Sequence, residues 1–183
     1  MKPGSRHSKE QRESWTAFIR ELHGSSDSRV VRLMDDFRQV AHRLYQLSEA
    51  SLESSGLSYA QFRVLMGLRY REWAGNHDGL NPSEISDQQG TSRNTISSLI
   101  RSLEEAKLIE RHLDENDRRR FNIRLTDAGR QIVFDHAATH VQLSDELFAA
   151  LDEDDIETFS RILHTLNRQS DKMKDQHSSP SRR

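Results

Sequence analysis

The sequence predicts a mainly α-helical fold with one small β-hairpin. Apolar residues recur at intervals of three and four along most of the chain, which is the period of one helix face. The 183 residues include only three prolines and eight glycines, so few positions interrupt a helix. A strictly alternating segment, Phe121–Leu125, follows a charged turn, as the second strand of a hairpin would.

The first 27 residues form an N-terminal extension with one possible short helix. Trp15, Phe18 and Leu22 have helical spacing within residues 13–22, and Gly24 follows as a helix breaker. Because an apolar helix stripe usually packs, we expect Trp15 to lie against the body of the protein or a second subunit. Contact with a ligand is the alternative.

A long amphipathic helix is expected over residues 28–52, and Gly56 ends this region. Its apolar stripe consists of Val30, Leu33, Met34, Phe37, Val40, Ala41, Leu44 and Leu47. The next helix begins after Ser58, which forms a capping box with Gln61, and extends to about Trp73.

A helix-turn-helix is expected next. The segment Asn81–Glu84 places Asn at the N-cap, Pro at the first helical position and Glu at the third. That short helix ends before Gly90, and Thr91 or Ser92 opens a second helix. Two helices joined by a short turn containing Gly have the helix-turn-helix signature.

A hairpin and two further helices complete the chain. Residues 108–113 and 121–125 form its expected strands. Thr126 caps the first of the two helices and Asp152 caps the second. We expect a polar tail at residues 173–183.

The outward face of the second helix of the helix-turn-helix is rich in small hydrogen-bonding side chains. Asn94 can pair with adenine and Arg93 with guanine in the major groove of DNA. A solvated surface is the simpler alternative, but surface helices usually prefer Glu, Lys and Gln over Ser and Thr. The candidate DNA-binding residues on this helix are Ser92, Arg93, Asn94, Thr95, Ser97, Ser98 and Arg101.

The expected hairpin tip carries Arg118, Arg119 and Arg120, which suit the narrow, electronegative minor groove. Asp117 can hold one guanidinium in place. Residues 91–130 contain nine Lys or Arg and seven Asp or Glu, so they carry +2 while the rest of the chain carries −4. Positive charge is therefore local to the candidate DNA-binding region.

The segments Leu80–Leu103, Leu108–Arg111 and Asp114–Gly129 together resemble the MarR family of bacterial transcription regulators. The resemblance implies a winged helix-turn-helix with N- and C-terminal dimerisation helices. It implies a homodimer that binds double-stranded DNA at a pseudo-palindromic operator, usually as a repressor released by a small ligand. By position, Ser92–Ser98 fall in the recognition helix, and Asp117 and Arg119 match the wing aspartate and the minor-groove arginine.

The expected organisation follows from these segments. Residues 57–125 form the DNA-binding domain, residues 28–56 and 126–172 the helical dimerisation region, and residues 1–27 and 173–183 the extension and tail. Dimerisation also follows from burial, because these helices carry more apolar surface than a domain of about 75 residues can cover. A two-fold dimer would place its recognition helices about 34 Å apart, one turn of DNA.

The sequence departs from the family pattern at two places. Lys107 stands where the family usually has Gly, so we expect a different turn there. The N-terminal extension with Trp15 is similar to that of the urate-responsive branch. That branch has an aspartate where this chain has Arg63, which argues against a urate pocket.

Effector residues carry no motif of their own. The family analogy favours a small aromatic or phenolic effector between the dimerisation helices and the DNA-binding domain. The residues that could line such a site also suit a core or a solvated surface. The candidates are Trp15, His42, Tyr45, Phe62, Arg63 and Met66.

Enzyme, cofactor and membrane functions are not expected. No nucleophile–base motif or nucleotide-binding loop occurs, and without cysteine there is no thiolate metal site. His136 and His140 are a weak candidate pair of metal ligands. We expect a cytoplasmic protein without cofactors. The alternative is a winged-helix module that senses a metal or binds a protein without reading bases.

Overall fold

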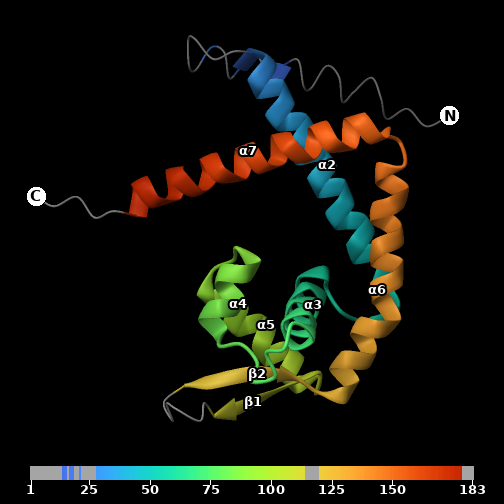
Figure 1. Ribbon diagram of the computed structural model, residues 1–183, viewed down its shortest axis with the longest axis vertical. Helices are drawn as coiled ribbons and strands as arrows, with labels where there is room; N and C mark the ends of the chain where they lie inside the picture. The colour runs from blue at the N-terminus through green and yellow to red at the C-terminus, as the bar shows by residue number, and fades with distance from the viewer. Residues whose placement is uncertain (1–13, 16, 19–20, 22–27, 114–119, 179–183) are drawn as a thin grey trace, which may run out of the picture. The chain divides into compact units, whose positions relative to one another are not determined.

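The computed structural model describes residues 14–15, 17–18, 21, 28–113 and 120–178. They form a mainly helical fold with one antiparallel hairpin, as predicted (Figure 1). The elements are α2 (Ser28–Ser51), the 3-10 helix η1 (Glu53–Ser55), α3 (Tyr59–Trp73), α4 (Pro82–Gln89), α5 (Arg93–Glu105), β1 (Ile109–Leu113), β2 (Phe121–Leu125), α6 (Asp127–Phe148) and α7 (Glu153–Ser178).

The predicted helix starts are confirmed. Ser58 and Gln61 form the capping box of α3, and Asn81 and Glu84 form that of α4. Ser92 is the N-cap of α5. The last helix is longer than expected, because α7 continues to Ser178 through residues assigned to the tail. No Gly or Pro interrupts residues 153–178.

The chain divides into two compact units, residues 1–136 and residues 137–183. The division falls inside α6, and the expected division into a DNA-binding domain and a dimerisation region stays a prediction. The first unit takes in all of α2, near whose end Ser48 and the following Leu52 are buried, and the start of α6, where Val133 joins the core.

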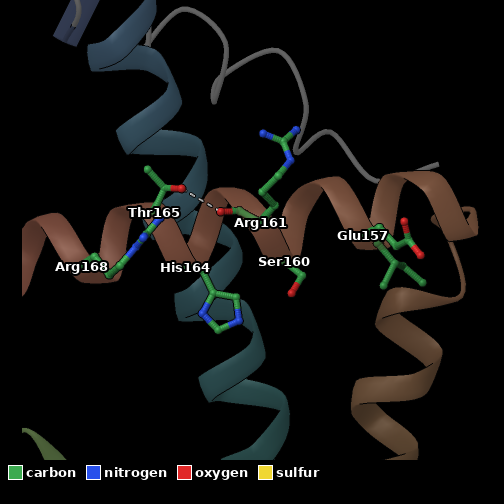
Figure 2. Close-up of a pocket in the computed structure, with 7 residues that line it drawn as sticks. Glu157, Ser160, Arg161, His164, Thr165 and Arg168 are labelled. Carbon is green, nitrogen blue, oxygen red and sulfur yellow. Dashed lines mark hydrogen bonds between the residues drawn. The ribbon is translucent and has the colours of Figure 1, made fainter.

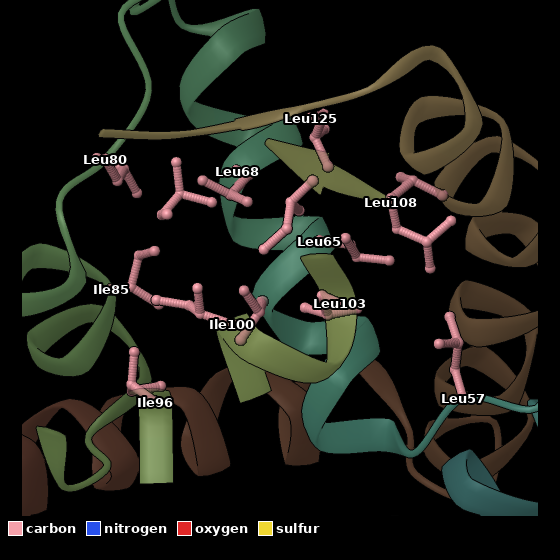
Figure 3. Close-up of a cluster of buried hydrophobic side chains, with 14 residues drawn as sticks. Leu57, Leu65, Leu68, Leu80, Ile85, Ile96, Ile100, Leu103, Leu108 and Leu125 are labelled. Atoms are coloured by element: carbon pink, nitrogen blue, oxygen red, sulfur yellow. The ribbon is translucent and has the colours of Figure 1, made fainter. Parts of the chain in front are cut away.

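One apolar core holds the first unit together (Figure 3). It is built from the inward faces of α3, α4 and α5, both strands and the first turns of α6. Its members are Leu57, Val64, Leu65, Leu68, Leu80, Ile85, Ile96, Ile100, Leu103, Leu108, Ile109, Ile123, Leu125 and Val133. The core fixes α5 and the hairpin relative to each other, and this positions the candidate site.

The hairpin pairs Ile109 with Leu125 and Leu113 with Phe121. Leu80, just before α4, pairs with Ile123 on the other edge of β2. Gly79 makes this approach possible, since a Cβ atom there would lie 2.3 Å from the carbonyl oxygen of Ile123. The base of the hairpin is therefore tied to the helix-turn-helix.

Candidate nucleic-acid interface

The N-terminus of α5 is capped and presented to solvent. The Ser92 hydroxyl accepts a hydrogen bond from the Thr95 amide at 3.2 Å and lies 2.9 Å from the Thr95 hydroxyl. Both side chains are thus used locally, although their surfaces stay exposed. On the opposite face, Ile96, Ile100 and Leu103 are buried in the core.

The turn before α5 is held by paired hydrogen bonds. The Ser86 hydroxyl donates to the Thr91 carbonyl at 2.5 Å, and the Thr91 amide donates to the Ser86 carbonyl at 3.2 Å. Gly90 between them has φ of 61°, a conformation that glycine adopts without strain. The angle between α4 and α5 is therefore fixed by backbone and side chain together.

Two links tie this turn and α5 to α3. The Gln89 side chain donates to the Arg63 carbonyl at 3.0 Å, and the Arg63 guanidinium reaches back to the Gln89 carbonyl at 3.5 Å. The side-chain amide of Gln61 donates from Nε2 to the Ser102 hydroxyl at 2.8 Å. Arg63, a candidate ligand residue, thus contacts the helix-turn-helix turn.

Five side chains form an exposed row on α5. Arg93, Asn94, Ser97, Ser98 and Arg101 fall within an arc of about 140° at 100° per residue. The hydroxyls of Ser97 and Ser98 donate to the carbonyls one turn back and keep lone pairs that can accept. Within the described part of the chain, the side chains of Arg93, Asn94 and Arg101 have no hydrogen-bond or ion-pair partner, so their donors are available to bases or phosphates.

The hairpin is anchored to α5 at its base. The Arg111 guanidinium pairs with Glu104 at 2.9 Å and lies 4.8 Å from the centroid of the Phe121 ring. Arg120 is exposed. The other predicted tip residues, Asp117, Arg118 and Arg119, lie outside the described residues.

Lys107 lies in the turn between α5 and β1. Its φ of 58° is left-handed, the region where a glycine would be unstrained. The Leu108 amide donates to the Leu103 carbonyl at 3.0 Å and the Lys107 amide to the Glu104 carbonyl at 2.9 Å, which is a Schellman motif. The expected difference in this turn is therefore wrong: it has the glycine-type geometry with a lysine in it.

The Leu-Thr-x-x-Gly segment joins the hairpin to α6. The Thr126 hydroxyl accepts from the Gly129 amide at 3.1 Å and donates to the Lys107 carbonyl at 2.8 Å. A Cβ atom on Gly129 would lie 2.1 Å from the carbonyl oxygen of Leu108. Glycine is required here because the two backbones touch.

An ion pair joins the first turn of α6 to the last turn of α3. The Arg130 guanidinium donates to Glu72 from Nη2 at 2.7 Å and from Nε at 2.9 Å, and to Asp127 at 2.7 Å. The hydrogen bond from Arg130 holds the pKa of Glu72 below its usual value, and the hydrogen bond to Glu72 raises the pKa of Arg130. Neither residue was expected at a functional position, because a lone Glu and a lone Arg 58 positions apart carry no sequence signal.

The structure places the predicted ligand residues in different surroundings. Phe62 is buried and meets the His136 ring edge-on at 6.3 Å, and Met66 packs on the core. His42 and Tyr45 are exposed on α2, where Tyr45 contacts Tyr59. Trp15 is exposed and packs against Phe18 with ring centroids 5.6 Å apart.

Metal and membrane sites are not found in the described part of the chain. It contains no group of three His, Asp or Glu side chains placed to hold a metal, and His136 instead contacts Phe62. No helix among the described residues combines the length and apolarity needed to cross a bilayer.

In the second unit, one face of α7 forms a shallow hollow lined by polar side chains, including Arg161, His164 and Arg168 (Figure 2).

Comparisons with known proteins place these features in a family. A model described as MarR family matches residues 55–120, from the end of η1 to the residue before β2. The transcriptional repressor MprA of Escherichia coli (strain K12) is 28% identical over 124 residues, which cover 66% of this chain and 68% of MprA. The HTH-type transcriptional regulator TcaR of Staphylococcus aureus (strain Newman) is 30% identical over 95 residues, covering 50% of this chain and 62% of TcaR.

A solved structure agrees with these relatives. The S. aureus MepR–DNA complex matches with a TM-score of 0.66 at 28% identity, covering 73% of this chain and 92% of that chain. The elements described above, α3 to α5 followed by a hairpin, form the winged helix-turn-helix of these proteins.

Proposed function

We propose that this chain, a member of the MarR family of winged helix-turn-helix transcription regulators, is a homodimeric repressor that reads a pseudo-palindromic operator. Members of this family bind DNA and are not enzymes. In this proposal α5 enters the major groove and the hairpin tip, with Arg118, Arg119 and Arg120, enters the adjacent minor groove. Asp117 holds one of these arginines in place.

The exposed row on α5 carries the proposal. Arg93 can donate two hydrogen bonds to guanine, and Asn94 can exchange two with adenine. Ser97, Ser98 and Arg101 lie one to two turns further along, where they suit phosphates or base edges. Ser92 and Thr95 order the helix N-terminus, whose free amides attract a phosphate.

The apolar faces of α2 and α7 support the homodimer. Val30, Leu33 and Phe37 on α2 are exposed within one chain, as are Ile162 and Leu166 on α7. Large apolar surfaces on separate helices are the usual mark of an oligomer interface. A second copy would cover them by two-fold symmetry.

Repression and effector control rest on relatives. MprA is named a transcriptional repressor, and the family resemblance adds release by a small molecule. For this chain a small aromatic or phenolic effector fits the aromatic character of Trp15 and Tyr45. Titration of phenolic acids into the protein–operator complex tests this part separately.

DNA reading is tested by selection from random duplexes, with and without a chelator, followed by anisotropy titrations. Arg93→Ala and Asn94→Ala should each weaken binding to the selected duplex by about 10- to 100-fold, since a good base contact contributes about 1–3 kcal/mol. Arg71→Ala, an exposed arginine on α3, is the matched control and should change binding less than about threefold. Selection of no sequence, or selection only when metal is present, would contradict the proposal.

A further inference from the structure

Helix α6 begins in the unit that carries the recognition helix and continues into the other unit. The boundary between the units falls between His136 and Ala137. The way in which the first turns of α6 are fixed therefore decides the direction in which the helix leaves the DNA-binding unit. Val133 packs in the core with Ile132 beside it, and two further contacts fix the start of the helix on two different neighbours.

The first contact is a pivot at Gly129. Its Cα approaches the Leu108 carbonyl and the Leu125 side chain so closely that no Cβ atom would fit. This contact sets the start of α6 against the base of the hairpin. This contact resists sliding of the helix, whereas the apolar packing of Val133 and Ile132 is non-directional and leaves the tilt less specified.

The second contact is the Arg130–Glu72 pair, which ties α6 to α3. Arg130 reaches both Glu72 oxygens from Nε, at 2.9 and 3.2 Å, and one of them again from Nη2 at 2.7 Å. The Glu72 side chain is only 21% exposed, so water competes for it less than for most surface carboxylates. A planar guanidinium held by two of its nitrogens resists rotation as well as separation.

Asp127 also pairs with Arg130 at 2.7 Å, but it lies on α6 itself. This pair orients the arginine and cannot tie α6 to a neighbour. The Arg130 guanidinium therefore makes one ion pair that joins α6 to α3, with Glu72, and one that stays within α6, with Asp127.

We propose that Glu72 and Arg130 are positioning residues that set the spacing between the half-sites the dimer accepts. The inference rests on the proposed dimeric function. From Arg130 to Phe148, α6 is about 27 Å long, so a tilt of about 10° at its start moves its far end by about 5 Å. That movement exceeds the rise of one base pair, about 3.4 Å. Loss of the Glu72–Arg130 pair would therefore widen the range of α6 tilts that the apolar packing allows, and with it the range of half-site spacings that the dimer accepts.

The test uses full-length protein and a panel of duplexes that carry the selected palindrome with its half-sites at the preferred spacing, one base pair closer and one base pair further apart. Wild type should prefer one spacing by about tenfold or more. Glu72→Gln and Arg130→Gln should each reduce this preference to about threefold or less. Affinity for a duplex with one half-site should change by less than about twofold, because no base contact is altered.

Two further variants separate positioning from stability. Asp127→Asn removes an ion pair of equal length from the same arginine and should keep the wild-type spacing preference. The reversed pair, Glu72→Arg with Arg130→Glu, should restore much of it. Thermal unfolding of every variant identifies loss of fold.

The outcomes are distinct. If Glu72→Gln weakens binding to all spacings equally, or if Asp127→Asn relaxes the preference as much as Glu72→Gln does, the pair only stabilises the fold and the inference is wrong. A wild-type protein that binds palindromes without any spacing preference also overturns it. If wild type selects no duplex sequence at all, the proposed function itself fails.

Discussion

Two regions of this molecule carry the same kind of apolar stripe and use it differently. In residues 57–133, the stripes of α3, α4 and α5 meet one another and the hairpin, and Leu65 and Leu103 are completely buried. On α2, the described residues of the first unit leave the stripe exposed: Leu33 is 69% exposed and Val30 61%. The first region is closed by its own residues, whereas the second is open.

The contrast shows what a hydrophobic period can and cannot tell. A repeat of three and four predicts a helix with one apolar face, whatever covers that face. In the closed region the cover lies within about 75 residues of the same chain. For the open helices, the proposed cover is a second copy of the chain. Substitutions in the two regions should therefore differ in their effect on dimer affinity and on the free energy of unfolding.

The largest effect is expected on the open stripe. Leu33→Asp combined with Phe37→Asp would bury two charges in the proposed interface, at a cost of about 3 kcal/mol or more. Dimer affinity should fall by about 100-fold or more. Sedimentation equilibrium measures this, and circular dichroism should show retained helix.

The matched control for this variant is Gln46→Asp. Gln46 is exposed on the same helix and lies about 180° around it from Phe37. It should leave the dimer unchanged. An unaltered dimer in the double variant would show that the stripe of α2 is not part of the interface.

A smaller effect is expected in the closed region. Leu65→Ala should lower the free energy of unfolding by about 3 kcal/mol, because its side chain is fully enclosed and leaves a cavity. The loss should be the same at different protein concentrations. Leu33→Ala should act mainly on dimer dissociation, and an equal, concentration-independent loss in both variants would remove the distinction between the regions.

Most of the fold could be predicted from the sequence because its signals are local. The capping boxes at Ser58 and Asn81 and the alternation of Phe121–Leu125 each depend on a few neighbouring residues. The exposed row on α5 follows from the same periodicity. The extent of α7 was underestimated because a polar helix end and a polar tail have the same composition.

What could not be predicted depends on contacts between distant residues. The Ser86–Thr91 bonds, the Glu72–Arg130 pair and the close approach at Gly129 exist only once the core has formed. The effector residues stay predictions, because a buried side chain such as Phe62 can either line a cavity or fill the core. Composition does not distinguish a cavity lining from a core.

The smallest effect is expected within the closed region, at the turn after α5. Lys107 is the one described non-glycine residue with positive φ, at 58°, and it closes the α5 Schellman motif. An L-residue pays about 1 kcal/mol for this conformation. The Thr126 hydroxyl bonds to the Lys107 carbonyl, so that contact does not depend on the side chain.

Lys107→Gly should therefore raise the free energy of unfolding by about 0.5–1 kcal/mol, after the greater freedom of glycine in the unfolded chain is subtracted. Lys107→Ala keeps the Cβ atom and should give no gain. Urea unfolding of both variants measures the difference, and dimer affinity should stay constant because the turn lies in the closed region. An equal gain in both variants would instead assign the cost to the lysine charge or stem rather than to its backbone.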